Sequence, residues 1–348
     1  MIKTNQKKVL VALSGGVDSS VCVHLLQEQG YYVEAAVMEF SSAHIQAVKD
    51  AQLVADQLGI KLHIIKCHEL FKENVIDYFA SEYLNGRTPN PCIICNPNTK
   101  FALLAQLRKD LGFDYMATGH YASVEYDEQN DKYYLKKAGV ADKDQSYMLY
   151  RLKQDELAVL MFPLNNLSKP QVREIAEQVK LPCANKPDSQ EVCFIPDNDY
   201  ASFITKGYGE SKKGKFIDPN GKPCGEHQGI LHYTVGQRKG LGIALGYPAF
   251  VKSIDPISGD VFLGRKGDEY STEIVLENCI MSVHHAVTDN MKVGIKIRSM
   301  AKECNCTAHK LDDKCWQVVF DEPQRAAAPG QSAVFYLNDI VLGGGIIR

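Results

Sequence analysis

The stretch that decides the fold of this 348-residue chain is Val9-Leu10-Val11-Ala12-Leu13-Ser14-Gly15-Gly16-Val17-Asp18-Ser19-Ser20. Its first five residues are apolar and predict a buried strand. Val21, Leu25 and Leu26 then follow at helical spacing and predict a helix that ends near Gly30. A glycine-rich turn between a strand and a helix gathers free backbone N–H groups and the positive end of the helix at one place. The stretch therefore predicts an anion-binding site at the start of a βα unit.

The side chains of this turn indicate which anion it binds. Three hydroxyls, those of Ser14, Ser19 and Ser20, can donate further hydrogen bonds, and Asp18 suits the Mg²⁺ ion that accompanies a phosphate. No lysine follows the glycines, which excludes the usual kinase and GTPase loop. The turn resembles the SGGxDS pyrophosphate loop of enzymes that cut ATP between the α- and β-phosphates to adenylate a substrate. The plain structural alternative is a serine- and glycine-rich turn before a surface helix.

Composition limits the class of protein. The chain is 45% apolar and 23% charged, and its length allows two or three domains with cores of their own. It has no apolar run of about 18 residues, and its N-terminus lacks the apolar core of a signal peptide. We therefore expect a cytoplasmic protein with no membrane partner. The eleven cysteines are not spaced as a disulfide framework, and the net charge of −3 means that any nucleic acid must bind at a local basic patch.

Strand and helix signals alternate over the first 120 residues. Strands are predicted at 9–13, 32–38, 61–67 and 115–118, and helices at 44–58, 69–84 and 98–110. This alternation is typical of βαβ units in a parallel sheet, whose ligands bind beyond the carboxyl ends of the strands. A hairpin is expected at 123–136, and a capping-box pattern at Ser168 predicts another helix. Glycines and short β-like runs dominate after about residue 203. We expect domains at 1–203, 204–271 and 272–348, the last a small antiparallel barrel.

Cysteines in polar loops require a chemical explanation. Cys92 and Cys95 form a C-x-x-C pair in a proline-rich turn, and Cys193 lies about 100 residues later in another polar loop. A structural zinc site needs a fourth ligand, and a redox C-x-x-C pair normally opens a helix, which the nearby prolines disfavour. A purely structural role for the pair also remains open. A further interpretation combines both loops with the ATP site: adenylation activates a carbonyl oxygen, a persulfide supplies sulfur, and a second thiolate releases it.

Motifs in a fixed order over 320 residues make the chain similar to the tRNA-specific 2-thiouridylases, which convert the C2 oxygen of the wobble uridine to sulfur. Besides the pyrophosphate loop, the motifs are T-P-N-P-x-x-x-C-N at 88–96, A-T-G-H-Y at 117–121, K-D-Q-S-Y at 143–147, D-S-Q at 188–190, C-F-I at 193–195, H-Y-T-V-G-Q-R-K-G at 232–240 and P-G-Q-S-A-V at 329–334.

The resemblance implies an α/β fold with an N-terminal parallel-sheet PP-loop ATP pyrophosphatase domain, a small central α+β domain and a C-terminal antiparallel β-barrel that contacts tRNA. It implies ATP-dependent 2-thiolation of tRNA: the C2 oxygen is adenylated with release of pyrophosphate, and persulfide sulfur displaces AMP. The cofactors implied are ATP and Mg²⁺. The partners implied are the tRNA anticodon loop and a persulfide sulfur donor protein.

The resemblance also implies roles for individual residues. Cys193 would carry the persulfide, Cys95 would be the second thiol, and Asp18 would hold Mg²⁺. The residues expected to bind ATP are Ala12, Leu13, Ser14, Gly15, Gly16, Val17, Asp18, Ser19, Met38 and Gly119. Those expected at the target base or on tRNA are Asn90, Pro91, Cys92, His120, Lys143, Asp144, Gln145, Arg298, Ser299 and Gln331. Arg87 and the basic Gln237-Arg238-Lys239 run are further candidates for nucleic-acid contact.

The sequence departs from the family pattern in three places. Cys92 stands where some members have an aspartate with an acid/base role, the segment between Met38 and His44 is short, and Ser299 stands where an aromatic residue is often found. Together, Cys92, Cys95 and Cys193 are three thiolates that could hold a [4Fe–4S] cluster whose fourth iron binds the transferred sulfur. The cluster route and the bare persulfide–disulfide route both remain open.

Two other functions remain as alternatives. An enzyme that adenylates a small molecule would use the same pyrophosphate loop, and ATP–pyrophosphate exchange without tRNA would favour it. A non-catalytic tRNA-binding protein would bind tRNA tightly without ATP turnover. The pair His284-His285 lies outside every motif and is expected to be a surface pair.

Overall fold

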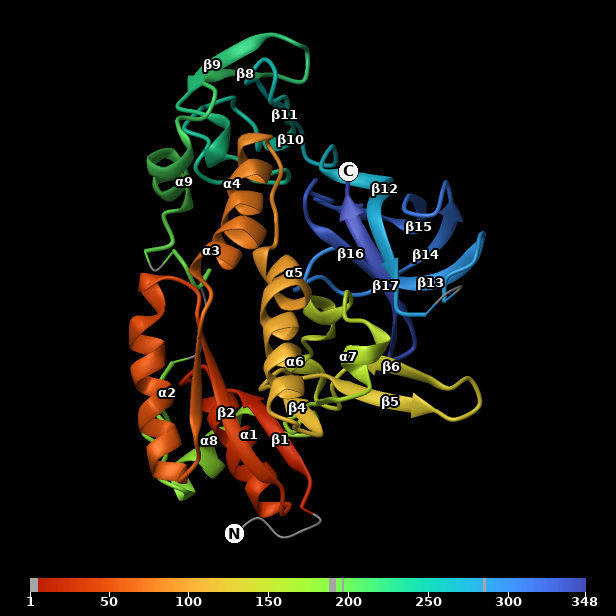
Figure 1. Cartoon of the computed structure of the whole chain (residues 1–348). Coiled ribbons are helices and arrows are strands. Elements are labelled where there is room, and N and C mark those ends of the chain that lie inside the picture. The colour runs from red at the N-terminus through yellow and green to blue at the C-terminus, as the bar shows by residue number, and fades with distance from the viewer. Residues whose placement is uncertain (1–5, 188–191, 196, 284–285) are drawn as a thin grey trace. The chain divides into compact units, whose positions relative to one another are not determined.

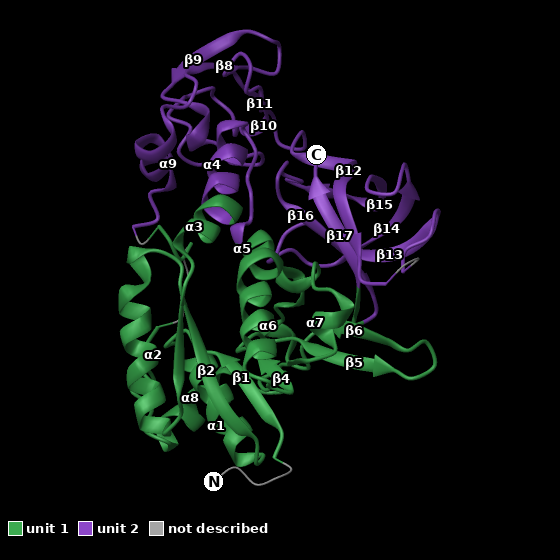
Figure 2. Ribbon diagram, in the orientation of Figure 1, with its two compact units in different colours: residues 1–74, 92–196, 339–341 green, residues 75–91, 197–338, 342–348 purple. Residues whose placement is uncertain are grey.

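The computed structural model describes residues 6–187, 192–195, 197–283 and 286–348 of the chain. They form two compact units, one of residues 1–74, 92–196 and 339–341, the other of residues 75–91, 197–338 and 342–348 (Figure 2). The chain crosses between them at 74/75, 91/92 and 196/197, and twice near its end.

A five-stranded parallel sheet forms the centre of the first unit (Figure 1). Its order is β3-β2-β1-β4-β7, and each neighbouring pair is parallel. The strands are β1 (Lys8–Ala12), β2 (Tyr32–Glu39), β3 (Leu62–Lys66), β4 (Tyr115–Ala117) and β7 (Leu160–Met161). The order reverses direction at β1 and β4, which is where open α/β sheets bind ligands. The predicted parallel α/β sheet is confirmed.

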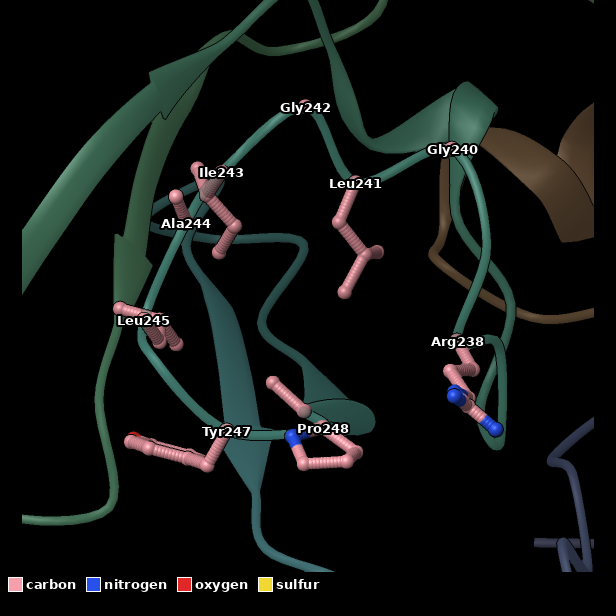
Figure 3. A pocket seen from close by; sticks show the side chains of 10 residues that line it. Arg238, Gly240, Leu241, Gly242, Ile243, Ala244, Leu245, Tyr247 and Pro248 are labelled. Atoms are coloured by element: carbon pink, nitrogen blue, oxygen red, sulfur yellow. The ribbon is translucent and has the colours of Figure 1, made fainter.

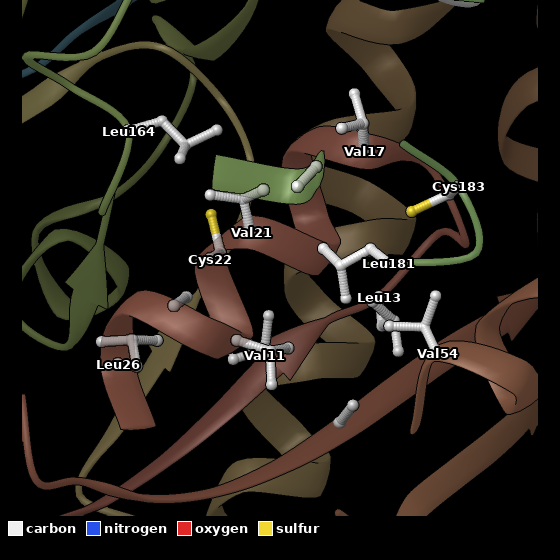
Figure 4. Packing of buried hydrophobic residues seen from close by; sticks show 14 of the residues in the cluster. Val11, Leu13, Val17, Val21, Cys22, Leu26, Val54, Leu164, Leu181 and Cys183 are labelled. Atoms are coloured by element: carbon white, nitrogen blue, oxygen red, sulfur yellow. The ribbon is translucent and has the colours of Figure 1, made fainter. Parts of the chain in front are cut away.

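Helices cover both faces of this sheet. On one face, α1 (Val17–Glu28), α2 (Ile45–Leu58) and α8 (Lys169–Gln178) bury apolar side chains against β1 and β2, and the segment around Leu181 and Cys183 completes that core (Figure 4). On the other face, α6 (Phe101–Asp110) packs against β1 and β4. The shorter helices of the unit are η1 (Ser42–His44), α3 (His68–Phe71), η4 (Ala141–Lys143), η5 (Ser146–Leu149) and α7 (Gln154–Leu157).

The cysteine segment is helical, so the expectation of a turn there was wrong. α5 (Pro91–Cys95) runs directly into the π-helical turn η3 (Asn96–Lys100) and then into α6. Pro91 is compatible with a helix because it stands in the first turn, where its missing N–H would have no partner. The predicted helix over 69–84 is also interrupted by a π-turn, η2 (Lys72–Ile76), between α3 and α4 (Asp77–Leu84). π-turns often occur at functional sites.

The expected hairpin is present in the first unit as β5 (Ser123–Asp127) and β6 (Lys132–Lys136). Lys136 of β6 also pairs with Ile340 at the start of β17 (Ile340–Ile347). Most of β17 belongs to the second unit.

The central part of the second unit is a four-stranded sheet of order β10-β11-β8-β9, accompanied by α9 (Tyr200–Tyr208) and η6 (Ile230–His232). Its strands are β8 (Gly214–Ile217), β9 (Pro223–His227), β10 (Phe250–Ile254) and β11 (Val261–Gly264). Phe216, Val251 and Val261 lie in its core. This mixture of helix and sheet confirms the small central α+β domain.

The C-terminal strands close into an antiparallel barrel, as predicted. The order is β12-β15-β14-β13-β16-β17, and β12 pairs with β17 to close it. The strands that precede β17 are β12 (Tyr270–Met281), β13 (Met291–Lys296), β14 (Cys304–Lys310), β15 (Trp316–Arg325) and β16 (Ser332–Leu337). Ile295, Val318 and Phe335 are fully buried inside. In the described part of the chain, no helix has the length and apolar character needed to cross a membrane.

Candidate functional site

The turn after β1 is held in a tight conformation by its own hydroxyls. The Ser14 amide donates to Ser19 Oγ over 3.1 Å, and Ser20 Oγ donates to the Gly16 carbonyl over 2.8 Å. Gly15 has a φ of +72°, and a Cβ there would lie 2.7 Å from Asp50 Cβ and 2.8 Å from the Ala51 nitrogen. Only glycine fits such a position, since an L side chain would meet both backbone strain and α2. The turn thus keeps its N–H groups available at the start of α1.

Asp18 lies at the centre of a charged network. Both of its carboxylate oxygens accept hydrogen bonds from Lys169 Nζ at 2.8 Å, and Tyr121 donates from its hydroxyl to Oδ1 at 2.9 Å. The side chain of Lys169 is only 11% exposed. Lys169 was not predicted as a site residue, although the capping box at Ser168 placed it in the first turn of a helix. Lys169 therefore brings a buried positive charge to the anion-binding turn.

The loop after β4 approaches this turn closely. A Cβ on Gly119 would lie 2.8 Å from the Ser19 nitrogen, so this close packing of the two loops requires glycine. Cys22 donates from Sγ to the Thr118 carbonyl over 3.6 Å, which joins the loop to α1. Met38 is buried near the end of β2, the neighbour of β1. The expected ATP-binding residues thus lie at the ends of three adjacent strands.

This arrangement fits ATP. The N–H groups in the first turn of α1, the exposed Ser14 hydroxyl and the Lys169 ammonium are donors of the kind that a polyphosphate needs, whereas the buried Ser19 and Ser20 hydroxyls donate to the Gly16 carbonyl. Asp18 is the acidic residue of the turn and a suitable oxygen ligand for Mg²⁺. In this structure Lys169 contacts both oxygens of Asp18.

The thiols differ in exposure. Cys95 is buried, whereas Cys92 and Cys193 are exposed. Burial raises the pKa of Cys95 to about 12, while the charge of Lys100 opposes this shift. Cys193 still exposes some surface. Its pKa is nevertheless raised to about 11, mainly because protein surrounds the thiol and secondly because of the charge of Cys92. Lys100, at the end of the π-turn, is the cation that favours both thiolates. The C-N-x-x-x-K spacing after Cys95 could have identified it.

Buried polar atoms without hydrogen-bond partners lie next to Cys95. In the described structure these include Asn96 Oδ1 and Thr99 Oγ1, both in the π-turn. Cys67 is also close enough for its charge to raise the pKa of Cys95 slightly, after burial and the nearer groups. Unsatisfied groups of this kind are rare in folded proteins and occur at functional sites.

The three thiols do not form a metal site in this structure. Among the described residues, no group of three or more His, Cys, Asp or Glu side chains is arranged to hold a metal ion. All eleven cysteines are free thiols. The geometry therefore does not fit the hypothesis of a [4Fe–4S] cluster on Cys92, Cys95 and Cys193.

Several residues expected on tRNA make contacts inside the first unit. Asp144 accepts hydrogen bonds from the Ala138 amide and from the amide and hydroxyl of Ser146. Gln145 exchanges two hydrogen bonds with the Tyr121 backbone, at 2.8 and 3.0 Å. These contacts link the K-D-Q-S-Y motif to Tyr121 and hence to Asp18.

His120 is held neutral next to this network. The pKa of His120 lies well below the ordinary value, mainly because the imidazole is buried and secondly because of the charge of Lys100. Its Nδ1 lies 2.9 Å from Thr118 Oγ1. His120 therefore has no positive charge to offer to a phosphate at neutral pH. A tRNA contact by His120, Lys143, Asp144 or Gln145 stays a prediction.

Arg87 donates from its guanidinium to Glu82 and Glu277 within the second unit, and its contact with nucleic acid stays a prediction. Gln331 donates from Nε2 to the Thr88 carbonyl over 2.6 Å, and Arg298 is exposed just after β13 beside Ser299. Contacts of these last three residues with tRNA stay predictions.

The basic run at Gln237-Arg238-Lys239 borders a hollow in the second unit. The hollow has a volume of about 470 Å³ and is formed by the loop that follows Arg238 (Figure 3). Leu241, Ile243 and Tyr247 line it beside Arg238. A phosphate contact here stays a prediction. The D-S-Q motif at 188–190 and the pair His284-His285 lie outside the described residues.

Comparison with known proteins assigns a family to all three parts of the chain. Residues 7–197 match the tRNA methyl transferase HUP domain, 201–265 the tRNA methyl transferase PRC-barrel domain and 271–347 the aminomethyltransferase β-barrel domain. The tRNA-specific 2-thiouridylase of Acetivibrio thermocellus is 46% identical over 99% of this chain and all of its own length. Those of Clostridioides difficile and Caldanaerobacter subterraneus are 44% and 47% identical, each over 98% of both chains. The solved structure of an NMN synthetase from Francisella tularensis is also similar. The match covers 53% of this chain and 67% of the synthetase chain, with 18% sequence identity and a TM-score of 0.34.

Proposed function

The chain belongs to the family of tRNA-specific 2-thiouridylases, which are tRNA sulfurtransferases, and we propose that it uses ATP to replace the C2 oxygen of the wobble uridine of tRNA by sulfur. One observation supports the proposal most strongly. The same compact unit contains an anion-binding turn with the buried Lys169 and two thiols, Cys95 and Cys193, whose thiolates the charge of Lys100 favours. A small-molecule ligase would need the first feature but not the second.

The first step is adenylation. The expected ATP-binding residues at 12–19, Met38 and Gly119 hold the nucleotide, with Lys169 and the turn N–H groups on its phosphates. The uridine O2 attacks the α-phosphorus, a new O–P bond forms, and the α–β bridging P–O bond breaks to release pyrophosphate. Mg²⁺ bound through Asp18 and the phosphates would neutralise charge on the leaving group.

The second step transfers sulfur. A donor protein first leaves a persulfide on Cys193. Its outer sulfur attacks C2, and AMP leaves with the former O2. The Cys95 thiolate then attacks the inner sulfur, so that a Cys95–Cys193 disulfide forms and the sulfur remains on C2. The two thiols lose two electrons and the sulfane sulfur gains them, so the step balances, and a reductant must restore the thiols for the next cycle.

The raised pKa values of Cys95 and Cys193 keep both thiols unreactive until the reaction begins. With pKa values near 12 and 11, Cys95 and Cys193 are protonated at neutral pH and resist oxidation. The Lys100 charge stabilises each thiolate as it develops.

The remaining assignments complete the proposal. We assign Asn90, Pro91 and Cys92 to the target base, and His120, Lys143, Asp144, Gln145, Arg298, Ser299 and Gln331 to tRNA. We place the three domains at 1–203, 204–271 and 272–348, close to the segments that match the family models. Since the substrate is tRNA, we expect the protein to work in the cytoplasm.

Nucleoside mass spectrometry tests this function. Unmodified tRNA is incubated anaerobically with the protein, ATP, Mg²⁺ and a persulfide source, and its nucleosides are then analysed. We expect 2-thiouridine that depends on ATP. ATP–pyrophosphate exchange without tRNA, together with no 2-thiouridine, would instead identify a ligase for a small molecule.

A further inference from the structure

The described residues around Cys193 form a tight turn. The Ile195 amide donates to the Val192 carbonyl at 2.9 Å, so that Cys193 and Phe194 are the two central residues of the turn. These residues differ in exposure: Cys193 is exposed, whereas Phe194 and Ile195 are only 5% and 1% exposed. The position of the exposed thiol therefore depends on what holds the buried side chain beside it.

Phe194 packs against Phe71, the last residue of α3. The two ring centroids are 5.6 Å apart and the ring planes are 76° from parallel, which is the edge-to-face arrangement that aromatic pairs favour. Phe71 is fully buried, and both residues belong to the first compact unit. The Phe71 ring is thus a direct support for the turn that carries Cys193.

Phe71 is itself fixed to the parallel sheet. The Cys67 amide donates to the carbonyl of Glu39, the last residue of β2, at 3.2 Å, and the Phe71 amide donates to the Cys67 carbonyl at 2.9 Å. The Phe71 ring centroid lies 4.6 Å from that of Phe40, which directly follows β2. These contacts attach α3 to the carboxyl end of β2, at the edge of the sheet where the candidate site lies.

His44 completes the group of rings. Its ring centroid lies 5.2 Å from that of Phe40 and 6.1 Å from that of Phe71, and its Nδ1 lies 3.1 Å from Ser41 Oγ. Burial, above all, lowers the pKa of His44, so the imidazole is neutral at neutral pH. The rings of Phe40, His44, Phe71 and Phe194 together form what we call the aromatic cluster.

Cys95 is close to the same part of the first unit. Burial is the main cause of its raised pKa, and among the other thiols the charge of Cys193 contributes most and that of Cys67 least. Cys67 is the residue that precedes α3, so the helix that carries Phe71 begins near Cys95. Attack of one sulfur on another requires close alignment, and a misplacement of about 1 Å can cost about 100-fold in rate. A shift of the Cys193 turn would therefore slow the reaction of the two cysteines.

We propose that Phe71 is a positioning residue for sulfur transfer: its edge-to-face contact with Phe194 holds the Cys193 turn on the aromatic cluster and so keeps the sulfur of Cys193 within reach of Cys95. This inference rests on the proposed function. If Phe71 and Phe194 were only part of the core, their loss would lower the stability of the protein without a selective effect on sulfur transfer.

Substitutions of both rings test the proposal. Phe71→Leu removes the supporting ring but keeps an apolar side chain, and Phe194→Leu removes the ring of the turn in case the first variant does not fold. Phe113→Leu is the matched control, because Phe113 is 6% exposed and its ring lies 6.2 Å from that of Tyr32, at the opposite end of the sheet. Each variant is loaded with persulfide to the same extent. Its melting temperature is measured, and so are its rates of pyrophosphate release and 2-thiouridine formation in a single turnover.

We expect Phe71→Leu to slow 2-thiouridine formation about tenfold while the rate of pyrophosphate release changes less than about twofold. Phe194→Leu should have the same selective effect, and the double variant should be no slower than the slower single variant, because both changes remove one contact. Phe113→Leu should lower the melting temperature but keep both rates. Equal slowing of both steps in Phe71→Leu, or selective slowing in Phe113→Leu, would show a general effect of core packing and overturn the proposal. Unchanged 2-thiouridine formation in both Phe71→Leu and Phe194→Leu would overturn it as well.

A second readout separates this proposal from the proposed function. Oxidised glutathione exchanges with two nearby thiols and leaves a Cys95–Cys193 disulfide with two glutathione thiols, and this reaction needs neither ATP nor tRNA. We expect Phe71→Leu to slow disulfide formation about threefold or more relative to wild type and Phe113→Leu. Wild-type protein that makes no 2-thiouridine refutes the function, whereas equal rates of disulfide formation in Phe71→Leu and wild type refute the positioning role.

Discussion

Replacing Lys169 by methionine should disable the nucleotide site while preserving the fold. The ammonium lies 2.8 Å from both Asp18 oxygens, and the two side chains are 11% and 31% exposed. Removing one partner of a buried ion pair costs about 3–5 kcal/mol because the other charge is left uncompensated. Since Asp18 retains some contact with water, we take the lower end, about 3 kcal/mol, as the loss of folding stability. For the lost contact of Lys169 with a phosphate we take about 2 kcal/mol, within the range of a hydrogen bond to a charged group, which corresponds to about 30-fold in a rate or binding constant.

We expect at least this loss in kcat/KM for ATP because an unpaired carboxylate in the turn also repels the incoming phosphates. The assay is tRNA-dependent release of pyrophosphate at varied ATP. Lys180→Met, an exposed lysine just beyond the same helix, is the control. The double variant Asp18→Asn/Lys169→Met has no uncompensated charge and should melt at a higher temperature than Lys169→Met, although it also lacks the proposed Mg²⁺ ligand. A kcat/KM for Lys169→Met within threefold of wild type would refute the role given to this lysine.

Three other changes test separate parts of the account. Cys193→Ser should abolish 2-thiouridine formation and leave tRNA binding intact by filter assay, and a loss of binding alone would contradict the persulfide role. Because burial raises the pKa of Cys95 to about 12, its alkylation by iodoacetamide, followed by peptide mass spectrometry, should still accelerate above pH 9, and a plateau below pH 9 would show an acidic thiol instead. Gly15→Ala places a Cβ 2.7 Å from Asp50 Cβ and should lower the melting temperature and weaken ATP binding at least tenfold. Gly30→Ala has open space around it, so only the left-handed φ of +84° should cost stability, about 1–2 kcal/mol, and ATP affinity should be unchanged.

Local sequence patterns predicted most of the fold. The apolar run 9–13 and the glycine at 59 correspond closely to β1 and to the end of α2, since hydrophobic periodicity and left-handed C-terminal residues act over a few positions. The π-turn at 72–76 could not be foreseen, because a one-residue change of helical register has no local signal. Pro91 misled the prediction at the cysteine segment, because the same residue suits a turn and the first turn of a helix.

The candidate site was predictable only where its residues are close in sequence. The pyrophosphate loop and the cysteines were found from motifs, but Lys169 is 151 positions from Asp18 and Glu277 is 190 positions from Arg87. No periodicity connects such residues, because the pairing arises only when strands and helices pack. Asp144 shows the same limit: the hydrogen bonds that it accepts from the backbone of its own loop could not be read from its motif, and its contact with tRNA stays a prediction.

A single turnover of persulfide-loaded protein tests the central claim most directly. Protein carrying ³⁴S persulfide is freed of excess donor and mixed with ATP, Mg²⁺ and unmodified tRNA, and the nucleosides and cysteine peptides are then analysed by mass spectrometry. The account predicts ³⁴S in 2-thiouridine, an equal loss of persulfide from Cys193 and an equal gain of the Cys95–Cys193 disulfide. Labelled 2-thiouridine without that disulfide, or with the persulfide on Cys193 unchanged, would contradict it.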